Sequence, residues 1–243
     1  MSAPGLVETV EDGVVRWTLD HPARRNAVHP DALTWITHRC ATLRGEVVIL
    51  RGAGDQAFCA GFDLTALNPS ADGPPPDAPL AQASVAMEAA DATFVAAING
   101  LTIGAGLELA CACDVRIARD DAWFAVPAAK LGVVYHADGL RRLHAVLGPA
   151  IVRRMLLLGE RVDASALLEA GALTHVVAPT ALDATVEAVV EALQSGAALS
   201  QRAHRAFFRA LDRGDLDEET LRTHAAARAE AYAAIRAAKA NAR

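Results

Sequence analysis

The alternation of hydrophobic and polar residues predicts several short strands within residues 1–180. "VVRWTLD" (14–20) alternates as a half-buried strand does. "EVVILRG" (46–52) and "TFVAAI" (93–98) are continuous runs of apolar and β-branched residues, which is typical of strands covered on both faces. The same criteria predict further short strands at 114–118, 122–126 and 174–178.

Helical patterns lie between these strands and dominate the end of the chain. The spacing of apolar residues predicts a helix over 29–43, where Pro30 and Asp31 suit a helix start. A second helix is expected from Ala105 to Cys113, and the chain is Ala-rich and helical after about residue 181. These patterns predict an α/β core over residues 1–180 and a helical C-terminal region over 181–243.

Composition excludes several classes of function. The formal net charge is -6, and no stretch is basic enough to follow a phosphate backbone, so nucleic acid is not an expected partner. The start of the chain lacks the pattern of a signal peptide or a presequence, which favours a cytoplasmic protein. No CxxC pair exists, and buried free thiols are expected at Cys40, Cys59, Cys111 and Cys113.

The apolar stretch 94–113 is long enough to cross a bilayer, but it contains Asn99, Glu108 and three glycines. A buried core segment is the better interpretation, and no membrane is expected. Segment 68–79, "NPSADGPPPDAP", has almost no bulky side chains and is expected to be a mobile loop. It follows the glycine turn in "FCAGFDL" (58–64), so it either covers a small-molecule site or is a surface loop without a role.

The stretch "INGLTIGAGLELACACD" (98–114) carries the candidate chemistry. A strand is expected to end near Asn99, and a helix to begin near Ala105. The first N–H groups of a helix have no intrahelical partner and can hold a developing oxyanion. Glu108 lies about one turn further on, where a carboxylate in an apolar wall can exchange protons near neutral pH. The alternative is that Glu108 only favours the helix dipole. The turn in "FCAGFDL" offers a second N–H donor.

Several stretches, in order along the chain, resemble motifs of the crotonase superfamily, also called the enoyl-CoA hydratase/isomerase superfamily. They are "HPARRNAV" (21–28), "FCAGFDL" (58–64), "AAINGLTIGAGLELACACDVRIA" (96–118), "AWFAVPAAKLGVVYHADGLRRLHAVLG" (122–148) and "ALLEAGALTHVV" (166–177). The resemblance implies a repeated ββα superhelix, followed by C-terminal helices that build a homotrimer or a dimer of trimers. It implies an acyl-CoA thioester as substrate, with coenzyme A as part of that substrate and no other cofactor.

The resemblance also implies roles for individual residues. The thioester oxygen would be held by the N–H groups of Phe62 and Ala105, although the family usually has Gly at the second position. Lys239 of a neighbouring subunit would reach the CoA phosphates. Other CoA contacts are expected near Arg24, Arg25, Ala60, Asp63 and Leu64.

One catalytic position departs from the family pattern. Glu108 matches the family's first glutamate, but the second falls on Ala128, directly after Pro127. The family's Pro-Gly-x-Gly-Gly turn is replaced by "VYHADG" (134–139). Three residues of this segment could replace the missing second glutamate as acid or base, namely Tyr135, His136 and Asp138. Each of them could instead be a polar loop residue.

Three functions therefore stay open. The first is a hydratase, or a related lyase or isomerase, that uses Glu108. The second is a malonyl-type acyl-CoA decarboxylase, because a Tyr after "LGV-x" (131–134) resembles that subgroup. The third is an acyl-CoA-binding protein without catalysis. A dinucleotide site at Gly52-x-Gly54-x-x-Ala57 lacks its helix, a serine hydrolase lacks its GxSxG elbow, and no histidine cluster suggests a metal.

Overall fold

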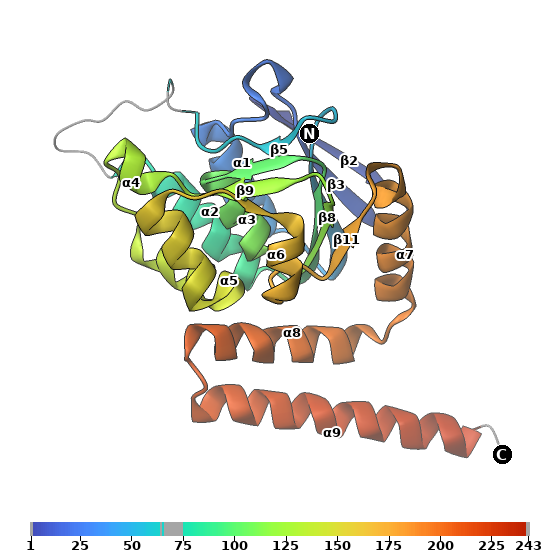
Figure 1. Cartoon of the computed structure of the whole chain (residues 1–243). Coiled ribbons are helices and arrows are strands. Elements are labelled where there is room, and N and C mark those ends of the chain that lie inside the picture. The colour runs from blue at the N-terminus through green and yellow to red at the C-terminus, as the bar shows by residue number, and fades with distance from the viewer. Residues whose placement is uncertain (1, 64, 66–74, 242–243) are drawn as a thin grey trace. The chain divides into compact units, whose positions relative to one another are not determined.

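A seven-stranded sheet forms the frame of the N-terminal part of the chain (Figure 1). The computed structural model describes residues 2–63, 65 and 75–241. Strand β2 is antiparallel to its neighbours β1 and β3, and each further neighbouring pair of strands is parallel. The order is β1 (Ser2–Ala3), β2 (Leu6–Glu11), β3 (Val14–Leu19), β4 (Glu46–Gly52), β6 (Ala92–Ile98), β8 (Val115–Arg119) and β11 (His175–Val177).

A second, smaller sheet positions the candidate site. Its order is β10 (Val162–Asp163), β9 (Trp123–Ala125), β7 (Leu101–Ile103) and β5 (Ala57–Cys59). Strands β5, β7 and β9 are parallel, so their carboxyl ends meet at the same edge. The turns that follow these three strands therefore lie side by side, although they are far apart in the sequence.

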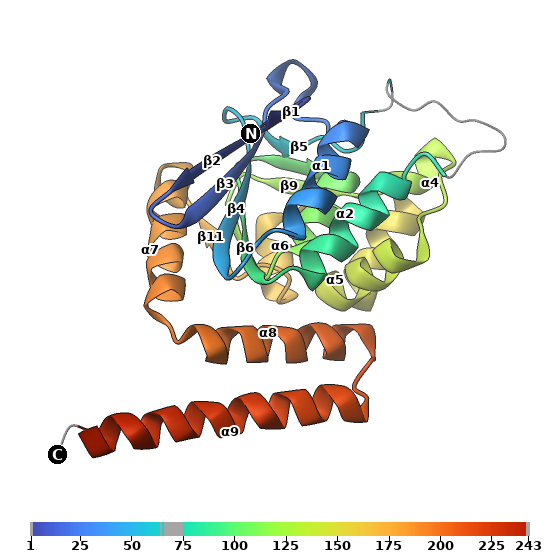
Figure 2. The ribbon, with the colours of Figure 1, turned by 180° about the vertical axis from the view of Figure 1, so that it is seen from behind.

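Helices cover both faces of the large sheet (Figure 2). Helices α1 (Pro30–Cys40) and α2 (Ala78–Ala89) lie over one face, and α7 (Leu182–Ser195) lies over the other. An ion pair of 2.9 Å between Arg16 of β3 and Glu187 ties α7 to the sheet. The remaining helices of this part are α3 (Ala105–Ala112), α4 (Ala128–Leu131), α5 (Ala137–Leu158) and α6 (Ala164–Glu169), with short 3₁₀ turns at Pro22–Arg24 and Pro179–Ala181.

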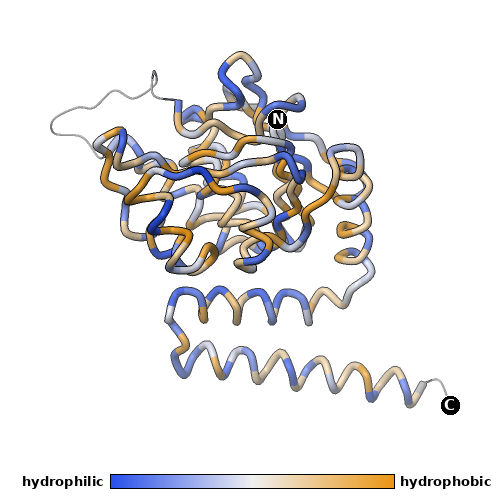
Figure 3. The backbone as a smooth tube through the Cα atoms, viewed as in Figure 1, coloured by the Kyte–Doolittle hydropathy of each residue, from blue (hydrophilic) through white to orange (hydrophobic). Residues whose placement is uncertain are grey.

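The core lies between the large sheet and the helices α1, α2 and α3. Trp17 of β3 and Phe94 of β6 are fully buried, and their ring centroids are 5.7 Å apart. In Figure 3 the hydrophobic colours concentrate on the strands and inner helices of this part. All four cysteines are buried and free, as expected.

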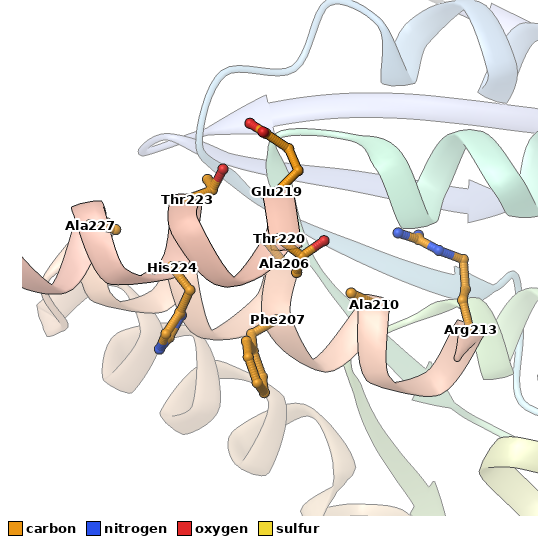
Figure 4. A pocket seen from close by; sticks show the side chains of 10 residues that line it. Ala206, Phe207, Ala210, Arg213, Glu219, Thr220, Thr223, His224 and Ala227 are labelled. Carbon is orange, nitrogen blue, oxygen red and sulfur yellow. The ribbon is translucent and has the colours of Figure 1, made fainter. Parts of the chain in front are cut away.

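Contacts divide the chain into two units, Met1–Val190 and Glu191–Arg243, so the division falls inside α7. In the second unit, α8 (Ala198–Arg213) and α9 (Glu218–Asn241) form a helical hairpin. A cavity of about 250 Å³ lies between them, and Figure 4 shows Phe207 and His224 at its wall, with ring centroids 4.8 Å apart. Large apolar side chains remain exposed on both helices, among them Phe208 and Tyr232.

Most predicted elements are confirmed, with three differences. The predicted strand-to-helix turn after Asn99 is wrong in detail, because β7 intervenes before α3 begins at Ala105. The predicted loop 68–79 overlaps residues outside the described part, and its last two residues begin α2. The prediction also missed several elements, among them the helices α2, α5 and α6 and the strands β1, β2, β5 and β10. Among the described residues, no helix combines the length and the apolar character needed to span a membrane.

Candidate functional site

A cavity of about 400 Å³ lies where the turns after β5, β7 and β9 meet. Phe62, Ala105 and Ala128 line it, one from each turn. Residues 131 and 133–135 form another wall, and residues 75–77 contribute from the segment before α2. Among the described lining residues, Asp77 and Tyr135 are the only titratable groups. The cavity is therefore largely apolar, as a site for an acyl chain requires.

Backbone N–H groups at two of these turns have no role in the secondary structure. Phe62 pairs with Val28 in a parallel bridge, which uses the N–H of Asp63 and the carbonyl of Gly61 at 2.9 and 2.8 Å. The N–H of Phe62 itself therefore faces away from Val28. Ala105 is the first residue of α3, so its N–H has no acceptor within the helix, and Gly104 provides no side-chain cap.

Glycines make both turns possible. Gly61 has a φ of +110° and Gly104 a φ of +52°, both in the left-handed region that other residues rarely adopt. A Cβ at Gly61 would also come within 3.3 Å of the carbonyl oxygen of Ile103. The two turns approach each other closely at this point, which brings the amides of Phe62 and Ala105 to the same cavity.

Glu108 lies one turn beyond Ala105 on α3, but it does not line the cavity. Its side chain is fully buried, and its Oε1 accepts a hydrogen bond of 2.8 Å from Nη1 of Arg142 on α5. His136 Nε2 lies 3.1 Å from Oε1 and 3.2 Å from Oε2. The predicted apolar wall around Glu108 is therefore wrong: the carboxylate is held by a guanidinium and an imidazole.

Sequence reasoning missed Arg142 and its second partner, Glu88 of α2. Arg142 Nε donates a hydrogen bond of 2.7 Å to Glu88 Oε1, and both side chains are almost completely buried. Burial opposes the charge of Arg142, but the hydrogen bond to Glu88 and the two nearby carboxylates raise its pKa. The only sequence signal for Arg142 was that two arginines interrupt the apolar residues of "GLRRL" (139–143). This segment was not predicted to be a helix, so Arg142 was not assigned to a buried helix face.

His136 is the N-cap of α5 and the neighbour of Glu108. The N–H of Gly139 donates to His136 Nδ1 at 3.1 Å, so in the neutral ring Nε2 carries the hydrogen and donates it to Glu108. The bond to Glu108 raises the pKa of His136, while burial lowers it to a smaller extent. Gly139 packs tightly here, since a Cβ would lie 2.8 Å from Glu108 Oε2.

The other two candidates of this segment differ from each other. Tyr135 lines the cavity and stacks on His136, with centroids 5.8 Å apart. Its hydroxyl is buried and has no hydrogen-bond partner among the described residues. Burial, followed by the charge of Glu108, raises the pKa of Tyr135 well above its usual value. Asp138 is exposed on the first turn of α5 and does not line the cavity.

Most of the residues expected near CoA belong to the 3₁₀ turn Pro22–Arg24 or to the turn after β5. Arg24 donates to Asp63 at 2.9 Å and to the Thr65 hydroxyl at 2.6 Å. The hydrogen bond from the Thr65 hydroxyl is the main cause of the lowered pKa of Asp63. Ala60 lines the cavity, and Arg25 is exposed in a left-handed conformation. Leu64 lies outside the described residues, and Lys239 is in α9 of the second unit.

A sequence model of the enoyl-CoA hydratase/isomerase family matches residues 9–239. The chain belongs to this family. The crotonase-like α/β fold predicted from the sequence is confirmed, as is an enzyme of the enoyl-CoA hydratase/isomerase class. Within the described residues, no group of three or more His, Cys, Asp or Glu side chains could hold a metal ion.

Relatives of this hydratase/isomerase family member include carnitinyl-CoA dehydratases. The protein from Proteus mirabilis is 38% identical over 176 residues, which cover 71% of this chain and 66% of the relative, just under two thirds of its length. The protein from Salmonella heidelberg is 32% identical over 213 residues, covering 84% of this chain and 80% of the relative.

Solved structures of the family superpose closely. An enoyl-CoA hydratase/carnithine racemase from Magnetospirillum magneticum is 32% identical, with a TM-score of 0.83 over 91% of this chain and 86% of its own. A protein from Thermobifida fusca, described as a candidate enoyl-CoA hydratase and solved in complex with CoA, is 30% identical with a TM-score of 0.79. The superposition covers 98% of this chain and 95% of the Thermobifida fusca protein.

Proposed function

We propose that this enzyme is a hydratase-type lyase that adds water to an enoyl-CoA thioester or removes it from a 3-hydroxyacyl-CoA. The observation that carries the proposal is the meeting of the Phe62 and Ala105 turns at one cavity, with Glu108 one helical turn beyond Ala105. Two amides that hold the thioester oxygen would stabilise the enolate formed during addition or loss of water. The carnitinyl-CoA dehydratases among the relatives support this class of reaction, because hydration and dehydration are one reaction in opposite directions.

Glu108 is the proposed acid/base group, with His136 as its hydrogen-bonded partner. The carboxylate lies outside the cavity, so it needs access to the substrate. Tyr135 is the lining residue that stacks on His136, and no hydrogen bond holds its hydroxyl among the described residues. We infer that a bound thioester displaces the Tyr135 side chain and opens a route to Glu108.

The proposal extends to binding and assembly. Arg24, fixed by Asp63 and Thr65, would contact the CoA phosphates or the adenosine. The CoA complex of the Thermobifida fusca relative supports a CoA thioester as substrate. The exposed apolar side chains of α8 and α9 are compatible with the homotrimer, or dimer of trimers, that the family resemblance implies.

A malonyl-type decarboxylase is the second candidate. In its favour, Glu108 does not line the cavity while Tyr135 does, and loss of CO₂ needs an oxyanion hole more than an acid and a base. Against it, the described lining residues include the acidic Asp77 and no Lys, Arg or His to bind a substrate carboxylate. The same charge distribution favours neutral or cationic acyl groups.

An assay panel tests the proposal. Purified protein is incubated with 2-enoyl-, 3-enoyl-, 3-hydroxyacyl- and malonyl-type CoA esters, and the products are followed by mass spectrometry. We expect a mass gain or loss of one water with the first and third classes. Glu108→Gln is expected to abolish this change while CoA-ester binding by calorimetry stays nearly unchanged. Release of CO₂ selects the decarboxylase, a shifted double bond selects the isomerase, and binding without turnover selects a non-catalytic protein.

A further inference from the structure

The buried Glu88–Arg142–Glu108 chain joins three helices. Glu88 belongs to α2, Glu108 to α3 and Arg142 to α5. The exposed fractions of the three side chains are 6%, 0% and 2%. Burying charges costs free energy that only accurate pairing recovers, so this cluster is not an incidental surface ion pair.

The guanidinium of Arg142 is fixed at two different nitrogens. Nε donates to Glu88 at 2.7 Å, and Nη1 donates to Glu108 at 2.8 Å. A planar guanidinium that is held at one edge can present its other edge in only one orientation. Glu88 therefore orients Arg142, and Arg142 orients the carboxylate of Glu108.

We propose that Arg142, fixed by Glu88, is a positioning residue that holds Glu108 in the rotamer required for acid/base work. The inference rests on the proposed role of Glu108. It assigns no contact with substrate to Arg142, which does not line the cavity. The bond from a fixed guanidinium limits the orientations that the carboxylate can adopt, which an apolar pocket alone would not do.

His136 provides a readout of this arrangement. The groups that face it are Glu108 from α3, Arg142 from α5, Asp77 from the segment before α2 and the stacked ring of Tyr135. Glu108 and Asp77 raise the pKa of His136, and the charge of Arg142 lowers it. If Arg142 positions Glu108, removing Arg142 displaces the carboxylate and lowers the titration midpoint of His136, whereas removing only the charge of Arg142 with Glu108 still in place raises it.

The experiment uses Glu88→Gln/Arg142→Gln, which removes one negative and one positive charge together. This double variant avoids the two uncompensated carboxylates that Arg142→Gln alone would leave buried. The matched control is Glu8→Gln/Arg39→Gln, which removes a second Arg–Glu ion pair. In this pair Arg39 Nε lies 2.7 Å from Glu8 Oε2, and the exposed fractions of the side chains are 17% for Arg39 and 6% for Glu8. Glu8 and Arg39 do not line the cavity or contact Glu108.

We expect the Glu88/Arg142 double variant to lose about 10²-fold in kcat, the effect of a misplaced catalytic group, with KM nearly unchanged. Its His136 midpoint, measured by NMR of the ring protons, is expected to fall because the misplaced Glu108 no longer accepts the bond that raises it, and its pH–rate profile is expected to shift. The control should keep the kcat and the midpoint of the wild type, even if its melting temperature falls.

Two results would overturn the positioning role. One is a Glu88/Arg142 variant that keeps the wild-type kcat, or whose His136 midpoint does not fall. The other is a variant that unfolds while the control folds, which would assign the pair to stability alone. Failure of the proposed function is distinguished by Glu108→Gln: wild-type turnover in that variant removes the acid/base role of Glu108 itself. An inactive Glu108→Gln beside a fully active Glu88/Arg142 variant removes only the positioning role.

Discussion

His136 Nε2 lies almost equally far from the two carboxylate oxygens of Glu108, at 3.1 and 3.2 Å. The hydrogen bond with Glu108 raises the pKa of His136 above its ordinary value of 6.5, against a smaller opposite effect of burial. A raised folded-state pKa means that the folded protein binds the proton more tightly than the unfolded chain. The resulting stability is complete below the unfolded value of 6.5 and is lost as pH rises through the folded value.

We therefore predict that His136→Gln destabilises the protein more in mildly acidic than in alkaline solution. The measurement is the free energy of unfolding in urea at about pH 6 and about pH 9, on either side of the titration range of a histidine with a raised pKa. His175→Gln is the control, because His175 is exposed on β11 and does not contact Glu108. An equal loss of stability at both pH values would show that the His136–Glu108 contact does not favour protonation.

The Ala105 amide can be removed with little change to α3. Ala105→Pro deletes the N–H, and proline is tolerated at the first position of a helix, where the N–H has no intrahelical partner. If this amide holds the thioester oxygen, kcat should fall by about 10²–10³. Ala105→Gly is the matched control, since it keeps the N–H and matches the residue usual in the family.

Circular dichroism should show that Ala105→Pro retains its helices. With that established, a loss in kcat of less than about tenfold, under 1.4 kcal/mol, would mean that the Ala105 amide is not a main source of stabilisation.

Local patterns in the sequence were sufficient for both glycine turns and for six strands, namely β3, β4, β6, β8, β9 and β11. A strand buried on one face shows alternating apolar and polar residues, and a strand buried on both faces shows a continuous apolar run, so both are visible in the sequence. Gly61 and Gly104 lie where the turns require a positive φ. The surroundings of Glu108 could not be predicted in this way. Its sequence neighbours are apolar, whereas its partners His136 and Arg142 come from residues 28 and 34 positions away. Pairing over such distances depends on how the helices pack.

Helix α5 illustrates a second limit. Gly148 and Pro149 mark a helix break in the sequence, and the structure has one there, because α5 (Ala137–Leu158) consists of two helical segments that meet at the non-helical Gly148. Gly148 has a φ of +75° and absorbs the change of direction. Because the helix was not recognised, Arg142 was not placed on its buried face, and the Glu88–Arg142–Glu108 chain was missed.

Ala128 offers a test of the missing second carboxylate. It lines the cavity directly after Pro127 at the start of α4, on the turn beside those of Phe62 and Ala105. We predict that Ala128→Glu increases hydration of a short enoyl-CoA, because a second acid would activate water independently of Glu108. Proton-transfer groups typically contribute about 10²–10⁴ in rate, so even a poorly placed carboxylate should give a measurable gain.

The control for Ala128→Glu is Ala128→Gln, which has nearly the same size without the acid. Equal activity of the two variants would indicate that the loop no longer accepts an enoyl thioester in the hydratase orientation. That result would favour the decarboxylase if the malonyl-type ester releases CO₂.

Tyr135→Phe tests whether the Tyr135 ring only covers Glu108 or whether its hydroxyl takes part in catalysis. The phenol lines the cavity, its oxygen is buried without a hydrogen-bond partner among the described residues, and its raised pKa keeps it protonated at working pH. If the ring only covers Glu108, Tyr135→Phe should keep kcat within about twofold and gain about 1 kcal/mol in stability from losing a buried, unpaired hydroxyl. Tyr232→Phe, at the only other tyrosine, is the control. A loss of about 10²-fold in kcat would instead make the hydroxyl a proton donor to the substrate.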